Sequence, residues 1–228
     1  MAKAAKISVK RAKPALNRRM IAEAALKLID AEGLEDLSMR QLGTMLGVEA
    51  MALYHHFHNK AELLDAVQEL LFEEIEATAP PGPAPLQRLR SMFEGSRHVA
   101  IAHPRAYLLV PTRRFRTRPL LEFYERFLQI FRDAGLDDEA SARYFRVLAG
   151  FATGASLAEI GSRAMQPDAS PVILEDFSDK TFPRVTAVVP YLQVAKLGRI
   201  YNFGLDLIFA AMEAEIGRTA ASQRAGPV

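Results

Sequence analysis

Apolar residues recur at helical spacing along almost the whole chain, and this pattern limits the fold more than any other feature. The first such segment, 15–32, places an apolar stripe on one helix face: Met20, Ile21, Ala24, Ala25, Leu28 and Ile29. Further helices are predicted at about 39–46, 49–56, 60–78, 86–102, 104–110, 119–134, 137–163, from Pro183 to Pro190, and at 196–217. No segment favours a strand and no internal repeat is visible, so the pattern predicts an all-α fold.

Capping signals set the boundaries of the N-terminal helices. Ser38 followed by Gln41 is a capping box, in which the serine hydroxyl accepts a hydrogen bond from a free backbone N–H at the start of a helix. Asn59 followed by Glu62 repeats this pattern and opens a long helix. Gly47 is the stop signal between them. Two short helices joined by a tight turn are therefore expected before the long one.

Prolines make the clearest interruption of the helical pattern. Pro80, Pro81, Gly82, Pro83 and Pro85 fall within six residues, and helices rarely cross such a run. We place a domain boundary at about 79–85. The predicted organisation is a flexible basic arm (1–14), an N-terminal domain with a long bridging helix (15–78), a larger C-terminal domain (86–217) and a tail (218–228), with a polar, turn-rich loop at 164–181.

Charge is distributed unevenly along the chain. Residues 1–60 carry ten Lys/Arg against six Asp/Glu, and the first nineteen residues contain no acid. Such an arm suits a polyanion, because each cation placed on a phosphate releases counterions; the alternative is a merely solvated tail. Since the chain has no cysteine, disulfides and thiol chemistry are excluded. Neither a signal peptide nor a membrane span is recognisable, so a cytoplasmic protein without membrane contact is expected.

Residues 37–67 are the most informative part of the sequence. Leu42, Leu46, Val48 and Leu53 would pack the two short helices together. The second of these helices would then keep an exposed polar and aromatic side. A helix-turn-helix offers its recognition helix to the major groove of DNA in this way.

At these positions the sequence resembles the tetracycline-repressor (TetR) family. The resemblance runs through Gly47-Val48, Leu53-Tyr54 and Asn59-Lys60, and it covers about residues 15–76. It implies an all-α protein in which an N-terminal three-helix helix-turn-helix domain is joined by a long helix to a helical dimerisation and ligand-binding domain. It also implies a homodimer that reads two half-sites of double-stranded DNA and represses transcription until a small molecule binds.

The resemblance assigns DNA-binding roles to eight residues. Arg40 matches a position that reaches a base edge, where arginine bonds guanine with two hydrogen bonds; a phosphate contact or a plain surface charge is the alternative. Tyr54, His55 and Lys60 match positions that grip phosphates. The residues expected on the base-facing side are Ala50, Met51, Ala52 and His56. The small and apolar ones among them suggest contacts to thymine methyl groups, which leaves specificity to Arg40, His56 and the basic arm.

The three histidines His55, His56 and His58 also raise the question of a metal site. A histidine pair on one helical face is usually spaced by three or four residues, and this trio lacks that spacing. We therefore expect no metal site and no cofactor.

The C-terminal half resembles the tetracycline-repressor type of effector domain. Residues 148–161 and 201–216 resemble its two dimerisation helices. The interface residues expected from this resemblance, most of them small, are Gly150, Gly154, Ala155, Gly204, Leu207, Ile208 and Ala211. Two such helices per subunit form a four-helix interface; the alternative is an intramolecular core. The last helix is expected to turn inward with Ile200, Phe203, Leu207, Ile208, Ala211 and Met212.

A mainly apolar effector pocket is expected among the helices between 70 and 163. The candidate lining residues, which the alternative assigns to an ordinary core, are Met92, Ser96, His103, Tyr107, Phe115, Phe123, Phe127 and Phe151. By the resemblance, the positions that hold tetracycline and its magnesium ion are occupied here by Glu76, Met92 and Arg114. Because Arg114 is a cation and cannot ligate a metal, magnesium-tetracycline is not the expected effector. Four neighbouring arginines could favour an acidic ligand, or could simply form a solvated loop: Arg113, Arg114, Arg116 and Arg118.

Two other classes of protein compete with a regulator. A helical enzyme would need a metal-ligand spacing, a phosphate-binding glycine loop or a nucleophile-base pattern, and the sequence offers none. An architectural DNA-binding protein would need the basic arm but no pocket. Sequence-specific DNA binding distinguishes the regulator from both alternatives.

Overall fold

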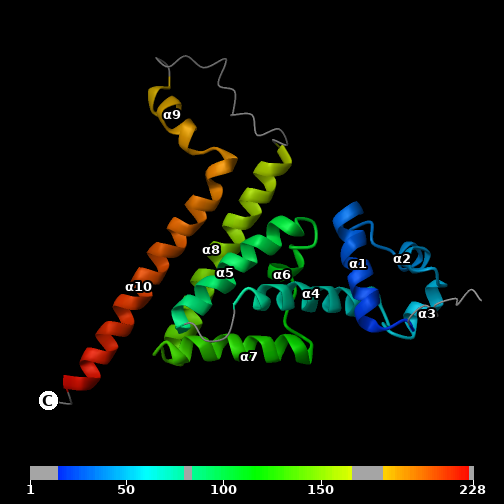
Figure 1. Ribbon diagram of the computed structural model, residues 1–228, viewed down its shortest axis with the longest axis horizontal. Coiled ribbons are helices and arrows are strands. Elements are labelled where there is room, and N and C mark those ends of the chain that lie inside the picture. The colour runs from blue at the N-terminus through cyan, green and yellow to red at the C-terminus, as the bar shows by residue number, and fades with distance from the viewer. Residues whose placement is uncertain (1–14, 80–83, 166–181, 226–228) are drawn as a thin grey trace, which may run out of the picture.

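The regular elements are helices throughout the described part of the chain, which comprises residues 15–79, 84–165 and 182–225 of the computed structural model (Figure 1). Strands are absent from these ranges, and the prediction of an all-α fold is confirmed. The α-helices are α1 (Arg18–Glu32), α2 (Met39–Leu46), α3 (Ala50–Tyr54), α4 (Lys60–Ala77), α5 (Pro85–Ala102), α6 (Leu109–Thr112), α7 (Arg118–Asp133), α8 (Asp138–Met165), α9 (Pro183–Val188) and α10 (Leu197–Ala225). Two 3₁₀ turns, Val189–Tyr191 and Val194–Lys196, connect α9 to α10.

Helix α4 joins the two ends of the molecule. Figure 1 shows α1, α2 and α3 gathered around its first half, while its second half runs into the group formed by α5, α6 and α7. Its buried residues include Leu63 and Val67 near the first group and Phe72 and Ile75 near the second. Helix α4 therefore packs against both groups.

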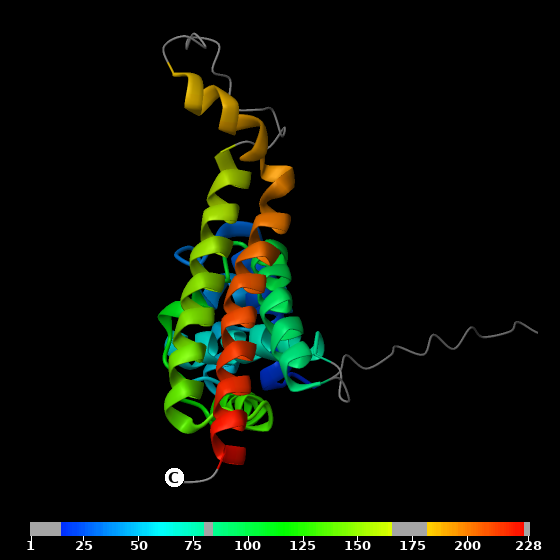
Figure 2. The ribbon, with the colours of Figure 1, turned by 90° about the vertical axis from the view of Figure 1, so that its left-hand side faces the viewer.

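The long helices α8 and α10 run antiparallel and side by side (Figures 1 and 2). Helix α5 packs against α8 and also against α4 and α7, so it lies at the centre of the C-terminal group. Helix α9 projects from the end at which α10 begins. Neither these nor any other described helix combines the length and the apolar character needed to cross a membrane.

Helix α10 carries two apolar faces. Its buried side chains are Tyr201, Leu205, Phe209 and Met212. Of the residues expected to turn inward, Met212 does so and Ile208 is partly buried, whereas four are exposed: Ile200, Phe203, Leu207 and Ala211. The prediction of the inward face was therefore wrong for these four. The apolar pattern reveals both stripes, but it does not tell which of them packs within the subunit.

Some helix ends differ from those expected. The segment 104–110 forms turns followed by the short helix α6, because a residue before proline is disfavoured in helical geometry, and His103 before Pro104 is non-helical at φ −124°, ψ 58°. Helix α10 continues through Gly217, where we expected its end, to Ala225. The loop expected at 164–181 lies largely outside the described residues, as does the basic arm at 1–14.

Candidate nucleic-acid interface and internal cavity

Two glycines shape the connection between α2 and α3. Gly47 ends α2 in the left-handed conformation, at φ 69° and ψ 37°, which glycine adopts without a steric penalty. The chain then turns so tightly that the N–H of Val48 donates to the carbonyl of Gly43 at 2.9 Å. A Cβ atom on Gly43 would lie only 2.8 Å from the backbone carbonyl oxygen of Val48. The sequence places α3 against α2 at a distance that only glycine permits.

Caps and buried anchors hold these helices in place. The Ser38 hydroxyl accepts from the N–H of Gln41 at 3.2 Å, and the Asn59 side chain accepts from the N–H of Glu62 at 2.9 Å. Both predicted capping interactions are therefore present. Leu53 is the one buried residue of α3. The other residues of α3 are exposed or partly buried, so this side of the helix can contact another molecule.

The eight predicted DNA-binding residues lie on or beside this exposed helix. Met51 is 69% exposed and Tyr54 is 42% exposed. Arg40 and His55 are also exposed, whereas Ala50, Ala52, His56 and Lys60 are partly buried. Lys60 donates from Nζ to the Leu34 carbonyl at 3.4 Å, so its amine lies close to the α1–α2 connection. Their individual contacts with DNA remain predictions.

Arg18 supports this surface, although its place in the sequence suggested no role beyond that of one basic residue near the N-terminus. Its guanidinium lies 4.2 Å from the centre of the buried Phe57 ring and donates to the His56 carbonyl. Arg18 therefore ties the start of α1 to the residues that follow α3.

The third histidine of the trio, His58, lies just before α4 with its Nδ1 3.0 Å from a carboxylate oxygen of Glu62. Hydrogen bonds from His58 lower the pKa of Glu62.

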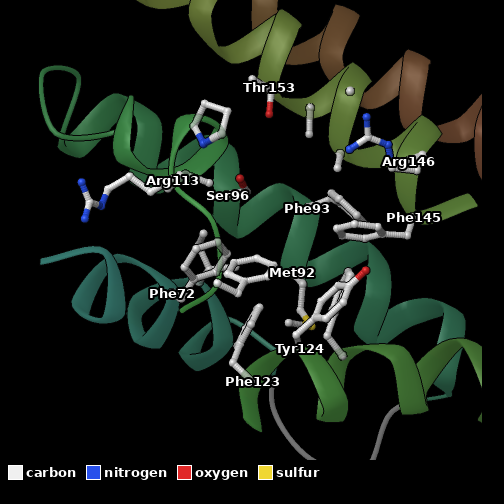
Figure 3. A pocket seen from close by; sticks show the side chains of 18 of the residues that line it. Phe72, Met92, Phe93, Ser96, Arg113, Phe123, Tyr124, Phe145, Arg146 and Thr153 are labelled. Atoms are coloured by element: carbon white, nitrogen blue, oxygen red, sulfur yellow. The ribbon is translucent and has the colours of Figure 1, made fainter. Parts of the chain in front are cut away.

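A cavity of about 770 Å³ lies between α4, α5, α7 and α8, with α6 and the residues after it on a further side (Figure 3). Its wall is rich in aromatic side chains: Phe72, Phe93, Phe115, Phe123, Tyr124, Phe127 and Phe145. Figure 3 shows Phe72, Met92, Phe123 and Tyr124 grouped on one side of the cavity. A space of this size and character suits a small organic molecule.

Five of the eight predicted pocket residues line this cavity: Met92, Ser96, Phe115, Phe123 and Phe127. Tyr107 lies behind the wall, where its hydroxyl is 3.0 Å from the Ser96 hydroxyl. Phe151 points to α10 instead and stacks near Tyr201 with ring centres 5.4 Å apart. Helical spacing alone could not separate a residue that faces the cavity from one that faces the next helix.

His103 lies away from the cavity, at the end of α5. Its Nδ1 is 2.7 Å from a carboxylate oxygen of Asp30 in α1, and its Nε2 is 3.1 Å from a carboxylate oxygen of Glu74 in α4. Nearby, Arg105 donates to the carbonyl of Ala31. These contacts join the C-terminal group directly to α1, so His103 is a connecting residue and does not line the cavity.

Arginines and hydroxyl groups contribute equally to the polar side chains of the cavity. Arg113, Arg114 and Arg146 line it, together with the hydroxyls of Ser96, Thr153 and Tyr124, and of these arginines only Arg146 was not singled out from the sequence. Burial raises the pKa of Tyr124, and the positive charge of Arg146 opposes this rise.

Among the described residues, no three His, Cys, Asp or Glu side chains gather as a metal site. Of the positions considered for magnesium-tetracycline, Met92 and Arg114 line the cavity, while Glu76 is paired with Arg126 at 2.8 Å.

The segment that follows α6 connects the cavity to α4. Arg113, which lines the cavity, donates through its guanidinium to the carboxylate of Asp65 and to the Ala61 carbonyl. The Gln68 side-chain amide donates to the Arg113 carbonyl at 3.3 Å. Both the side chain and the backbone of Arg113 are therefore held by α4.

The predicted interface residues divide into two groups. Gly150 and Gly154 are exposed and border the cavity, and Leu207 and Ala211 are exposed on α10. Gly204 instead faces the interior of the subunit, since a Cβ there would lie 2.2 Å from the Phe151 ring. Ala155 and Ile208 are partly buried against the core. Small residues on these helices thus serve contacts within the subunit as well as leaving an open face.

Two family profiles match the chain on either side of the proline-rich break. That of bacterial regulatory proteins of the tetR family matches residues 21–67, which include α2 and α3. That of the tetracyclin repressor-like C-terminal domain matches residues 85–216, more than half of the chain. The chain belongs to the tetR family. It is a TetR-family DNA-binding transcriptional regulator, and this family is not one of enzymes.

Curated relatives agree with this assignment. The chain is 30% identical over 159 residues to the tetracycline repressor protein class E from Escherichia coli, covering 67% of this chain and 74% of the relative. It is 29% identical over 149 residues to the HTH-type transcriptional repressor DrrR1 from Streptomyces coeruleorubidus, covering 65% and 55%. The match spans about half the length of DrrR1.

A solved structure of similar fold is that of the TetR family protein ActR from Streptomyces coelicolor in complex with actinorhodin. It superimposes with a TM-score of 0.71 at 27% identity, covering 89% of this chain and 99% of ActR. The TetR-family architecture therefore extends over nearly the whole described chain.

Proposed function

We propose that this TetR-family regulator is a ligand-responsive repressor that binds a palindromic operator as a homodimer and leaves it when a small, mainly apolar molecule enters the cavity. The observation that carries the proposal is the position of Arg113, which borders the cavity and is bonded to α4. Repression is supported by the names of the relatives DrrR1 and tetracycline repressor class E. Ligand control is supported by ActR, whose structure holds actinorhodin.

The homodimer is supported by the free apolar side of α10. Ile200, Phe203 and Leu207 are exposed there, on the side of the helix opposite Leu205 and Met212. Exposed apolar area of this extent on one helix favours a protein contact. Two-fold pairing would present two copies of α3, which must lie about 34–36 Å apart to enter successive major grooves.

Ligand release is proposed to act through α4. A molecule in the cavity contacts the segment 110–115, and this segment is bonded to the first turns of α4 through Asp65 and Gln68. Movement of α4 changes the separation of the two copies of α3 in the dimer. The ligand favours the released state only by the difference between its affinities for the two states.

The test is DNA binding to the region upstream of the protein's own gene. We expect anisotropy titrations to give tight binding that persists against random competitor DNA and weakens steeply with salt. Footprinting should protect two half-sites related by two-fold symmetry. Binding to all duplexes alike would instead indicate an architectural protein, and protection of a single half-site by a monomer would contradict the proposal.

Magnesium-tetracycline is proposed not to be the effector. Arg114 borders the cavity at a position that the family resemblance assigns to drug and metal binding, and a guanidinium repels a magnesium ion. Thermal-shift measurements with tetracycline and magnesium should therefore leave the melting temperature unchanged. A clear, saturable rise in melting temperature would contradict this expectation.

A further inference from the structure

Two arginines at the cavity differ from most arginines of the C-terminal group. Arg97 is bonded to Glu159 at 2.8 Å, Arg126 to Glu76 at 2.8 Å, and Arg113 to Asp65. Arg114 and Arg146 have no carboxylate within ion-pair distance in the ranges 15–79, 84–165 and 182–225. Both line the cavity. Two cations are therefore available to a molecule that enters it.

No negative charge in the cavity wall offsets these cations. Among the described residues that line the cavity, none is Asp or Glu, and the third lining arginine, Arg113, is neutralised from the side of α4. The remaining wall is mainly aromatic and aliphatic. Both arginines are exposed, so an anion would pair with them where the cavity meets solvent, through charge-assisted hydrogen bonds.

Arg146 lies on α8 beside Phe145, whereas most of the phenylalanines of the cavity come from other helices. Figure 3 shows Arg146 and Thr153 on α8, and Phe72, Phe123 and Tyr124 across from them on α4 and α7. The rings of Phe72 and Phe123 are in contact, with centres 4.8 Å apart. A ligand that fills this space would place flat apolar surface against the rings and an acidic group toward α8.

We propose that the effector of this cavity is a flat aromatic carboxylate, whose rings pack against the phenylalanines of the wall and whose carboxylate pairs with Arg146 or Arg114. This inference rests on the proposed ligand-responsive function and specifies the chemical class of the ligand. Arginine binds carboxylates with two parallel hydrogen bonds, and a neutral amide of the same shape cannot form the charged pair. The charge of the ligand, rather than its apolar area, then distinguishes it from other aromatic molecules.

The test uses two probes of equal shape, anthracene-2-carboxylate and anthracene-2-carboxamide. Their affinities are measured by fluorescence titration for the wild type, Arg146→Gln, Arg114→Gln and the double variant. Arg116→Gln is the matched control, because Arg116 is an exposed arginine on the same connection that does not line the cavity. Circular dichroism verifies that each variant is folded.

We expect the wild type and Arg116→Gln to bind the carboxylate about tenfold or more tightly than the amide, as charge-assisted pairs are stronger than neutral ones. The double variant should bind both probes with equal affinity, while its affinity for the amide stays at the wild-type level. Equal affinities in the wild type, a preference that survives in the double variant, or failure of the carboxylate to bind would each overturn the inference. Operator binding by the same preparations is measured separately, so loss of the proposed DNA-binding function would be recognised independently.

Discussion

Gly43 is the residue whose replacement should most directly disturb the packing of α3 against α2. In Gly43→Ala, the new Cβ would meet the Val48 carbonyl oxygen at 2.8 Å and the Ala50 nitrogen at 3.2 Å. Because both are backbone atoms, α3 must shift. We expect a loss of about 1–3 kcal/mol in unfolding free energy, which is typical of overpacking. Operator affinity should fall by about tenfold or more, since displacement costs base contacts of about 1–3 kcal/mol each.

Gly217→Ala is the control for this substitution. Gly217 is exposed within α10, and no atom lies within 4 Å of its added Cβ. Alanine there should leave stability unchanged or raise it by up to about 1 kcal/mol, because alanine favours helix over glycine. Urea denaturation and operator titration measure both variants. Wild-type values for Gly43→Ala would show that the turn tolerates a side chain.

Glu159 gives the structure a stability that depends on pH. Burial of its carboxyl acts to raise the pKa, but hydrogen bonds from Arg97 and Arg163 lower it overall, below the ordinary value of 4.5. A carboxyl whose pKa is lowered on folding stabilises the fold above its unfolded pKa, and this contribution disappears as the pH falls through the folded pKa. Glu159→Gln should therefore cost about 3 kcal/mol near pH 7, because it leaves Arg97 without its partner.

The pH dependence separates this effect from a loss of packing. The difference in unfolding free energy between the wild type and Glu159→Gln should shrink as the pH falls below about 4.5. Urea denaturation from pH 7 to pH 3 provides the measurement. A difference that stays constant over this range would assign the cost to shape rather than to charge.

At the scale of elements, the connection between Arg113 and α4 is measurable without any ligand. Arg113 and Asp65 are mostly buried, and their contact joins the segment after α6 to α4. A double-mutant cycle of Arg113→Gln, Asp65→Asn and the two combined should give a coupling energy of about 1–3 kcal/mol, as found for residues in direct contact. Urea denaturation of the four proteins provides the values. A coupling energy near zero would remove this pair from the proposed route between cavity and DNA.

Local signals explain which elements could be predicted. The ends of α1, α2 and α4 depend on residues within the same turn, such as Ser38, Gly47 and Asn59, so the sequence alone located them. The turns at 103–108 were missed because the apolar pattern concealed the effect of Pro104. The cavity was only partly foreseen, since Tyr124, Phe145 and Arg146 meet it through the packing of α7 on α8, which periodicity does not encode.

At the scale of the whole molecule, one apolar face of α10 packs within the subunit and the other is exposed. Tyr201, Leu205 and Met212 are buried within the subunit, whereas Phe203 is 61% exposed and Leu207 58% exposed. A helix that is apolar on both sides needs a partner on both sides. The sequence predicted that this helix contributes to an interface, but it could not tell which stripe packs within the subunit, because that depends on how α8 packs against α10.

Leu207→Glu tests whether the exposed stripe of α10 holds the dimer together. Because Leu207 makes little contact within its own subunit, the variant should keep the helical content and melting behaviour of a folded monomer. An unpaired carboxylate in an apolar interface costs several kcal/mol, so dimerisation should weaken by about 100-fold or more.

Asn202→Glu is the control, because it adds the same charge to an exposed polar position of α10 and should leave the dimer intact. Sedimentation equilibrium gives the assembly state, and anisotropy gives the operator affinity, which should fall together with dimerisation because a monomer reaches only one half-site. A Leu207→Glu protein that stays dimeric would place the interface on another face of the molecule.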